Sequence, residues 1–209
     1  MRRCLAIVGV AVTLAAAIGA RRDVRPLPYY GDVTLTPRWS EAVHVIGDFS
    51  LLDQKGRTFT RRDVAGRIYV ASFFYTTCKT LCPEIRDELV RVRDAYRGDT
   101  NVMILSHSVT PDSDNVAKLA HYAYANGIDD DQWRLLTGSR TEIERLARER
   151  YFVELSDTTG NTKGNLRHTE TLVLVDGSGH IRGVYDGSMP YEVTQLIADI
   201  RMLESSAGS

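Results

Sequence analysis

The sequence from position 72 to position 83 reads Ser72-Phe73-Phe74-Tyr75-Thr76-Thr77-Cys78-Lys79-Thr80-Leu81-Cys82-Pro83. It starts inside an uncharged run of β-branched and aromatic residues, 68–75, which predicts a strand buried on both faces. It ends at Pro83, and proline is favoured in the first turn of a helix, where its missing N–H costs nothing. Cys78 and Cys82 are therefore predicted to lie where a strand gives way to a helix. Unpaired N–H groups at a helix start lower the pKa of a thiol, and the thiolate serves both disulfide exchange and soft-metal binding.

The remaining cysteine, Cys4, belongs to a predicted targeting segment. Residues 4–20 are apolar or small with one exception, and arginines flank this run on both sides. A basic start and a short apolar run predict, over residues 1–20, either a cleaved signal peptide or a membrane anchor, and either one exports the domain. A disulfide between Cys78 and Cys82 would close too small a loop to stabilise the fold much. We therefore interpret the pair as functional, with a purely structural disulfide as the less favoured alternative.

Composition limits the other possibilities. The 209 residues suit one domain of ordinary size besides the targeting segment. The net charge is −1 and charged residues are dispersed along the chain, so we expect no nucleic-acid partner. Residues 21–40 hold three of the six prolines and predict a tether that is semi-rigid where proline dominates. Residues 41–209 are then predicted to form the folded domain.

The folded part alternates predicted strands with predicted helices. The strands are predicted at 47–60 (two short strands around a Lys55-Gly56 turn), 68–75, 102–109, 134–137, 169–175 and 180–185. The helices are predicted to begin at Pro83, at Thr110-Pro111, at a Ser139 capping box and at Pro190. Such alternation indicates the α/β class. A buried strand that enters a helix at a cysteine pair, with a closing ββα unit, predicts a thioredoxin-like fold with an N-terminal β-hairpin and a helical insertion.

The second half of the predicted site is the run Leu166-Arg167-His168-Thr169-Glu170, which precedes the late hairpin. A thioredoxin-type oxidoreductase carries a cis-proline there, but no proline lies between Pro111 and Pro190. In this architecture His168 would face the cysteines, and two thiolates with an imidazole form a soft trigonal site that suits copper, especially Cu(I). Zinc normally needs a fourth ligand, and none is evident. The alternative is that the histidine is exposed or bonded to a backbone carbonyl.

The other histidines are weaker ligand candidates. His44, His121 and His180 lie in tether-proximal, helical and turn contexts, which predicts surface positions. His107 follows a predicted strand near the carboxyl edge of the sheet, where sites gather, so it is an outer-shell candidate only.

The run from Thr77 to Pro83, with His168 before a late hairpin, resembles the SCO/SenC family of copper chaperones. The layout of residues 48–56 and 102–112 is also similar, and the resemblance covers roughly residues 45–203. It implies copper, as Cu(I) or Cu(II), held by Cys78, Cys82 and His168. It also implies a protein exported to the bacterial periplasm or the outer face of the cytoplasmic membrane, and attached there through its N-terminal segment or secreted.

The same resemblance implies a role in assembling the copper centre of cytochrome c oxidase. The expected partner is the copper subunit of that oxidase or another copper protein. The chain departs from the family at Lys79, where many members have proline, and at Arg167, where many have aspartate. Both changes make the site more electropositive, which favours thiolates and leaves the ligand set intact.

Several functions remain open at this point. The leading hypothesis is an exported copper metallochaperone, which is not an enzyme. The alternative is a dedicated thiol-disulfide oxidoreductase acting on copper-site cysteines, with Cys78 as nucleophile and Cys82 as resolving thiol. A peroxiredoxin-like peroxidase is less favoured, because the threonine it needs three residues before the nucleophile is replaced by Tyr75.

Overall fold

The computed structural model describes residues 26–40, 44–128, 130–154 and 170–207. The predicted targeting segment 1–20, the polar loop that precedes the late hairpin, and His168 lie outside these described residues. Within the described ranges, no helix has the length and apolar character that crossing a bilayer requires.

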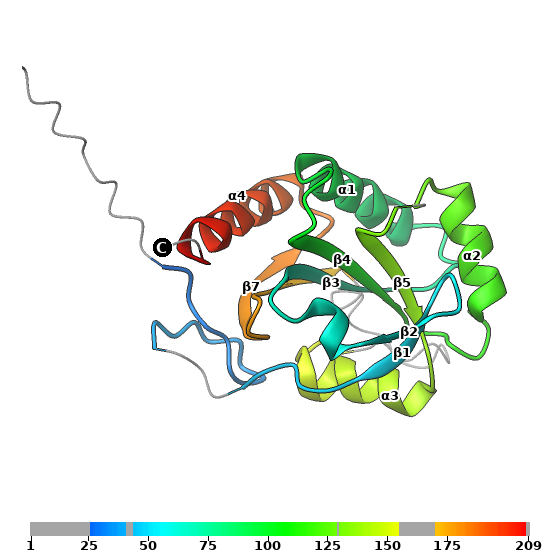
Figure 1. The fold of residues 1–209 in the computed structure, drawn as a ribbon, viewed down its shortest axis with the longest axis horizontal. Helices are drawn as coiled ribbons and strands as arrows, with labels where there is room; N and C mark the ends of the chain where they lie inside the picture. Colours follow the sequence, from blue (N-terminus) through cyan, green and yellow to red (C-terminus); the bar gives the residue numbers. More distant parts are fainter. Residues whose placement is uncertain (1–25, 41–43, 129, 155–169, 208–209) are drawn as a thin grey trace, which may run out of the picture.

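A seven-stranded sheet with the order β2-β1-β5-β4-β3-β6-β7 organises the fold (Figure 1). The strands are β1 (Ser50–Asp53), β2 (Thr58–Thr60), β3 (Ile68–Phe74), β4 (Val102–Ser108), β5 (Trp133–Thr137), β6 (Thr171–Val175) and β7 (Ile181–Asp186). The three central strands β3, β4 and β5 are parallel, while β6 pairs with β3 and β1 pairs with β5 in antiparallel fashion. The N-terminal hairpin, β1 with β2, is as predicted from the sequence.

The helices cover both faces of the sheet, and Figure 1 shows α1 and α4 on one side and α3 on the other. They are α1 (Leu81–Ala95), α2 (Val116–Ala125), α3 (Arg140–Arg145) and α4 (Pro190–Ala207), with a 3₁₀ turn η1 (Arg61–Val64) and a π turn η2 (Leu146–Arg150) that continues α3. All seven residues of β3 are buried, as expected for a strand covered on both faces. Because side chains alternate along a strand, Val70 lies in the hydrophobic core between the sheet and α1, while Phe73 lies in the core between the sheet and α3. We call these the α1 core and the α3 core.

The predicted start is confirmed for one helix and wrong for another. The Ser139 cap is confirmed, since its hydroxyl accepts a hydrogen bond from the Glu142 N–H at 3.2 Å. The helix predicted to open at Thr110-Pro111 begins instead at Val116, capped by Asn115. The reason is that Asp114 is turned inward and its backbone N–H bonds to the Thr110 carbonyl in a tight turn. The prediction of the helix was right and its first residue was wrong.

Residues 27–30, within the described part of the predicted tether (26–40), lie against the start of β7. Arg182 donates to the carbonyl oxygens of Leu27 and Pro28, at 2.6 and 3.1 Å, and its guanidinium carbon lies 4.0 Å from the centre of the Tyr29 ring. The Tyr30 N–H bonds to the Ile181 carbonyl at 3.0 Å. Four successive residues are therefore held to the start of β7, so this stretch is docked on the domain.

Candidate functional site

The cysteine pair lies where β3 passes into α1, at the carboxyl end of the parallel strands. The chain leaves β3 at Phe74 and enters α1 at Leu81, so that Cys82 is the second residue of the helix. Both cysteines are free thiols; Cys78 is half-buried and Cys82 is buried. The Cys82 N–H donates to the Cys78 sulfur at 3.4 Å, which makes Cys78 an acceptor for one of the unpaired donors at the helix start. The predicted strand-to-helix junction is confirmed.

The two thiols have opposite electrostatic environments. Burial opposes ionisation of Cys78, but hydrogen bonds from the Cys82 thiol, from the N–H groups of Cys82 and Thr80 and from the Tyr75 hydroxyl outweigh it and lower its pKa to about 7. Burial raises the pKa of Cys82 to about 12, and the neighbouring Cys78 adds to the shift. Cys82 is desolvated because it packs in the core under α1, where Ile85 belongs to the same cluster. The site therefore holds one readily formed thiolate, on Cys78.

A buried carboxylate that the sequence analysis did not single out anchors the loop before Cys78. Asp114 is 1% exposed, and its Oδ2 accepts hydrogen bonds from the Thr76 N–H at 3.0 Å, the Ser108 hydroxyl at 2.8 Å and the Thr110 hydroxyl at 2.9 Å. Its Oδ1 accepts from the Thr76 hydroxyl at 2.6 Å and lies 3.1 Å from the Lys118 ammonium. Burial works against the charge, but these hydrogen bonds, those of Thr76 first, lower the pKa of Asp114.

The Asp114 network joins three elements around one charge. Thr76 is two residues before Cys78, Ser108 ends β4, and Lys118 is in the first turn of α2. Since both carboxylate oxygens bind Thr76, the position of the β3–α1 loop is fixed relative to β4. The signal available in the sequence was an aspartate close to several hydroxyl side chains after a strand, Ser108, Thr110 and Ser113, since a buried carboxylate needs such donors.

His107 is buried on the face of the sheet that α3 covers. His107 is fully buried between the rings of Phe73 and Tyr151, with ring centres 5.0 and 5.4 Å away, and its Nδ1 lies 3.2 Å from the Ser72 carbonyl oxygen. Its neighbours belong to the α3 core, so the sheet separates it from the cysteines, which lie on the α1 side. Burial lowers the pKa of His107 to about 4. The prediction of an outer-shell role for His107 is therefore wrong.

Two of the three predicted surface histidines are also covered. His180 is 8% exposed and meets the Tyr29 ring edge-on, with ring centres 5.4 Å apart. His44 is half-buried, with Nε2 2.8 Å from the Arg150 carbonyl oxygen. The docked segment 26–30 covers His180, a contact between distant parts of the chain that local sequence does not indicate. The surface position of His121 is confirmed.

Chemically, the described site offers two sulfur donors of unequal acidity. Among the residues that the structure describes, no three histidine, cysteine or acidic side chains are grouped to hold a metal ion. Cys78 and Cys82 thus provide two donors suited to a soft metal, or the two partners of a disulfide.

Comparison with known proteins identifies the family. The SCO1/SenC family model matches residues 38–204. The SCO1 protein homolog of Bacillus subtilis is 26% identical over 157 residues, which are 73% of this chain and 79% of that protein. The mitochondrial SCO2 homolog of Bos taurus is 36% identical over 107 residues, 49% of this chain, and the match spans only 38% of the bovine protein.

Solved structures agree with the fold. BsSco, described as a member of the Sco family of cytochrome c oxidase assembly proteins with a disulfide switch, aligns with a TM-score of 0.68 and 23% identity over 78% of this chain and 94% of its own. Copper-bound ScoI of Bradyrhizobium japonicum aligns with a TM-score of 0.59 and 25% identity over 75% of this chain and 98% of its own. These likenesses confirm the predicted thioredoxin-like fold. Because the family model covers most of its length, the chain belongs to the SCO1/SenC family.

Proposed function

We propose that this chain is an exported copper metallochaperone that binds copper through Cys78, Cys82 and His168 and supports assembly of the copper centre of cytochrome c oxidase. The observation that carries the proposal is the thiol pair at the start of α1, with a readily ionised Cys78 beside a buried Cys82. Thiolate ligands select soft metals such as Cu(I). The copper bound to the related ScoI supports the choice of metal.

The assignment of His168 as the third ligand is supported by the position of the residues that follow it. Glu170, two residues later, accepts a hydrogen bond from the Gly187 N–H at 2.7 Å. The next strand, β6, runs antiparallel to β3, with Val173 opposite Ala71. The start of β6 therefore lies at the same edge of the sheet as the end of β3, which leads to the cysteines. A residue just before β6 therefore belongs to the same edge of the sheet as the cysteines, which supports His168 as a ligand.

Export and attachment belong to the proposal as well. Residues 1–20 serve as a signal peptide or a membrane anchor and place the domain in the bacterial periplasm or at the outer face of the cytoplasmic membrane. The recipient of copper is the copper subunit of cytochrome c oxidase or another copper protein. Transfer then proceeds by exchange of thiolate and imidazole ligands between the two proteins.

A second candidate function rests on the same thiols. A dedicated thiol-disulfide oxidoreductase needs an attacking thiol whose pKa is near the ambient pH and a second thiol to resolve the mixed disulfide. Cys78, with a pKa of about 7, and the buried Cys82 fit these two roles. The difference between the candidates is His168, because disulfide exchange needs no imidazole ligand.

Copper loading of the reduced full-length chain, followed by native mass spectrometry, tests the proposal. We expect one copper per chain, lost in Cys78→Ser, Cys82→Ser and His168→Ala, and retained in the control His121→Ala, since His121 is exposed. Unchanged copper affinity in His168→Ala refutes the ligand set. Full rescue of oxidase activity by His168→Ala in cells, with failure of both serine variants, favours the oxidoreductase instead.

A further inference from the structure

The two ends of the parallel strands carry different features. The carboxyl end carries the cysteine loop, whereas the amino end carries the residues that lead into β3, β4 and β5, among them Arg67, Asn101 and Gln132. We refer to this amino end of the sheet as the basal end. β7 begins there too, because it is antiparallel to β6, whose last residue Val175 pairs with Tyr69 near the start of β3.

The N-terminal part of the chain joins the domain at this basal end. Arg182, near the start of β7, binds the carbonyls of Leu27 and Pro28. Pro26 and Leu27 line a cavity of about 180 Å³ together with Met202 and Leu203 near the end of α4. Figure 1 shows this first described segment, in blue, beside the end of α4. The first described residues, 26 and 27, are therefore held at the basal end, opposite the cysteines.

Only residues 21–25 separate this fixed point from the apolar run 4–20. A fully extended stretch of five residues spans at most about 17 Å. If residues 4–20 lie in a bilayer, the basal end cannot be far from the bilayer surface, and the docked residues Leu27 and Pro28 limit how far the domain can swing.

The basal end also carries an arginine-lined cavity of about 800 Å³. Its arginines are Arg57, Arg62, Arg67, Arg97 and Arg134. In this order, they come from the turn between β1 and β2, from η1, from the residue before β3, from the turn after α1 and from β5. Guanidinium groups bind phosphate through paired hydrogen bonds, which makes such a cavity suited to phosphate-bearing groups.

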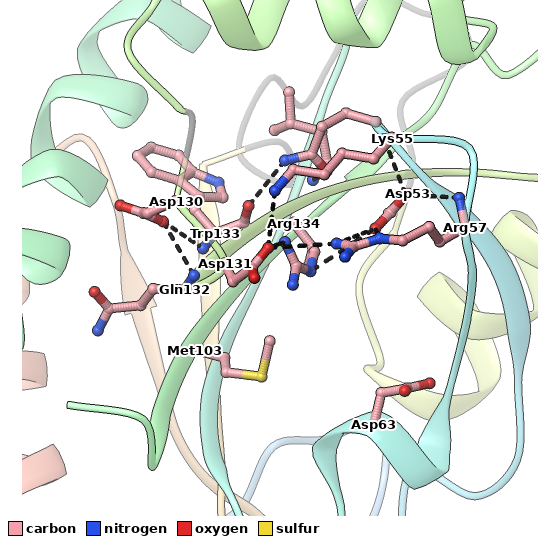
Figure 2. A network of polar contacts seen from close by, with 12 residues as sticks. Asp53, Lys55, Arg57, Asp63, Met103, Asp130, Asp131, Gln132, Trp133 and Arg134 are labelled. Atoms are coloured by element: carbon pink, nitrogen blue, oxygen red, sulfur yellow. Dashed lines mark hydrogen bonds and ion pairs between the residues drawn. The ribbon is translucent and has the colours of Figure 1, made fainter. Parts of the chain in front are cut away.

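Five aspartates line the same cavity, as many as the arginines. The affinity of the cavity for anions therefore depends on which arginine N–H groups are not already bound to these aspartates. Figure 2 shows Asp53 and Asp131 surrounded by Lys55, Arg57 and Arg134. Asp131 accepts from Lys55 and from Arg134, at 2.8 Å each, and Asp53 accepts from the Arg57 side chain at 2.8 Å. The other three aspartates accept hydrogen bonds from residues close to them in the sequence.

Two of the arginines keep their donors available. Among the described residues, Arg62 has no hydrogen-bond or ion-pair partner for its side chain, and Arg67 donates only to the Met103 sulfur, at 3.3 Å. The Arg134 side chain is 9% exposed, and its Nε has no hydrogen-bond partner within the described chain; Asp53 Oδ2 is 3.9 Å away. Arg62 and Arg67 therefore keep guanidinium N–H groups that are not bound to oxygen within the described chain, and such groups can bind an external oxyanion.

We propose that the basal end is a membrane-facing surface whose arginine-lined cavity, through Arg62 and Arg67, receives the phosphate headgroups of the bilayer that holds residues 4–20. The inference rests on the membrane anchor of the proposed function. Since β3 spans seven residues, the cysteine loop is held about 23 Å further from the bilayer than Arg67. The cysteine loop then lies at the end of the domain that faces away from the membrane.

The test uses the copper-free full-length chain in nanodiscs of phosphatidylglycerol that contain a small share of a gadolinium-chelating lipid. The gadolinium broadens the amide NMR signals of residues close to the headgroups. We expect the signals of residues 61–67 and 98–101 to be lost while those of residues 77–80 persist. Equal loss at both ends, or loss at 77–80 alone, overturns the inference.

Charge reversal tests the arginines themselves. Arg62→Glu with Arg67→Glu should restore the signals of residues 98–101, whereas the control pair Lys79→Glu with Arg140→Glu, two exposed cations at the cysteine end, should leave them broadened. Unchanged broadening in the first pair overturns the assignment of the cavity to headgroups. A chain that does not enter the nanodiscs at all refutes the proposed anchor as well, while its copper loading, measured separately, still tests the copper part of the proposed function.

Discussion

Replacing Asp114 by asparagine should loosen the loop that presents Cys78. The asparagine keeps one oxygen, which can occupy the Oδ2 position and accept from the Thr76 N–H, Ser108 and Thr110. Its amide nitrogen then replaces Oδ1, so the hydrogen bond from the Thr76 hydroxyl and the ion pair with Lys118 are lost. The lost hydrogen bond to a charged acceptor costs about 1.5–3 kcal/mol, and the partly exposed ion pair adds at most about 1 kcal/mol.

We therefore expect Asp114→Asn to lower the free energy of unfolding, measured by urea denaturation, by about 2–4 kcal/mol. The matched control is Asp112→Asn in the same loop. The Asp112 side chain is 71% exposed and pairs with a half-exposed Arg140, so its loss should cost less than about 1 kcal/mol.

The consequence for the site is a less acidic Cys78. If the loop moves and the hydrogen bond from the Cys82 N–H to the Cys78 sulfur is lost, the pKa of Cys78 rises from about 7 toward its ordinary value. At pH 7 the thiolate fraction then falls by up to about 50-fold if the pKa returns from about 7 to 9.0. The assay is the alkylation rate of Cys78, read by peptide mass spectrometry on the folded variant. An unchanged rate in Asp114→Asn, together with the expected loss of stability, would show that Asp114 supports the fold without setting the thiol.

Three further predictions follow from the same structure. Cys78 should alkylate faster than Cys82 near neutral pH, because its pKa is about 7 against about 12, and a faster Cys82 would reverse the assigned polarity. The folded-state pKa of His107, about 4, is below its ordinary value of 6.5, so the unfolded chain binds the extra proton. Stability should therefore fall by about 3 kcal/mol as the pH drops from 6.5 to 4, and His107→Phe should show a smaller fall in urea denaturation over that range. Arg182→Ala removes two hydrogen bonds and a cation–π contact to residues 27–29, besides the hydrogen bond to Asp176. Proteolysis within residues 26–40 should therefore accelerate, and an unchanged cleavage rate would contradict the docking described above.

Short-range patterns in the sequence were sufficient to predict most strands and helices and to locate the thiol pair between a strand and a helix. The uncharged run before Tyr75 predicted a strand buried on both faces, and β3 is such a strand. Pro83 in the first turn and the hydroxyl of Ser139 at a helix start are signals that act within a few residues, so they hold in any tertiary context. For the same reason the strand run and Pro83 together predicted the strand-to-helix junction that carries both cysteines.

Only the tertiary structure decided how those residues are used. Alternation along β4 shows that His107 and Ser106 face opposite sides, but the packing of α1 and α3 decides that His107 is on the side away from the cysteines. The same is true of Asp114, whose charge is stabilised by donors from Thr76 and Ser108, residues that only the parallel pairing of β3 with β4 brings together. The difference in acidity between the two thiols arises likewise from burial and hydrogen-bond direction, and these depend on contacts between residues far apart in the sequence.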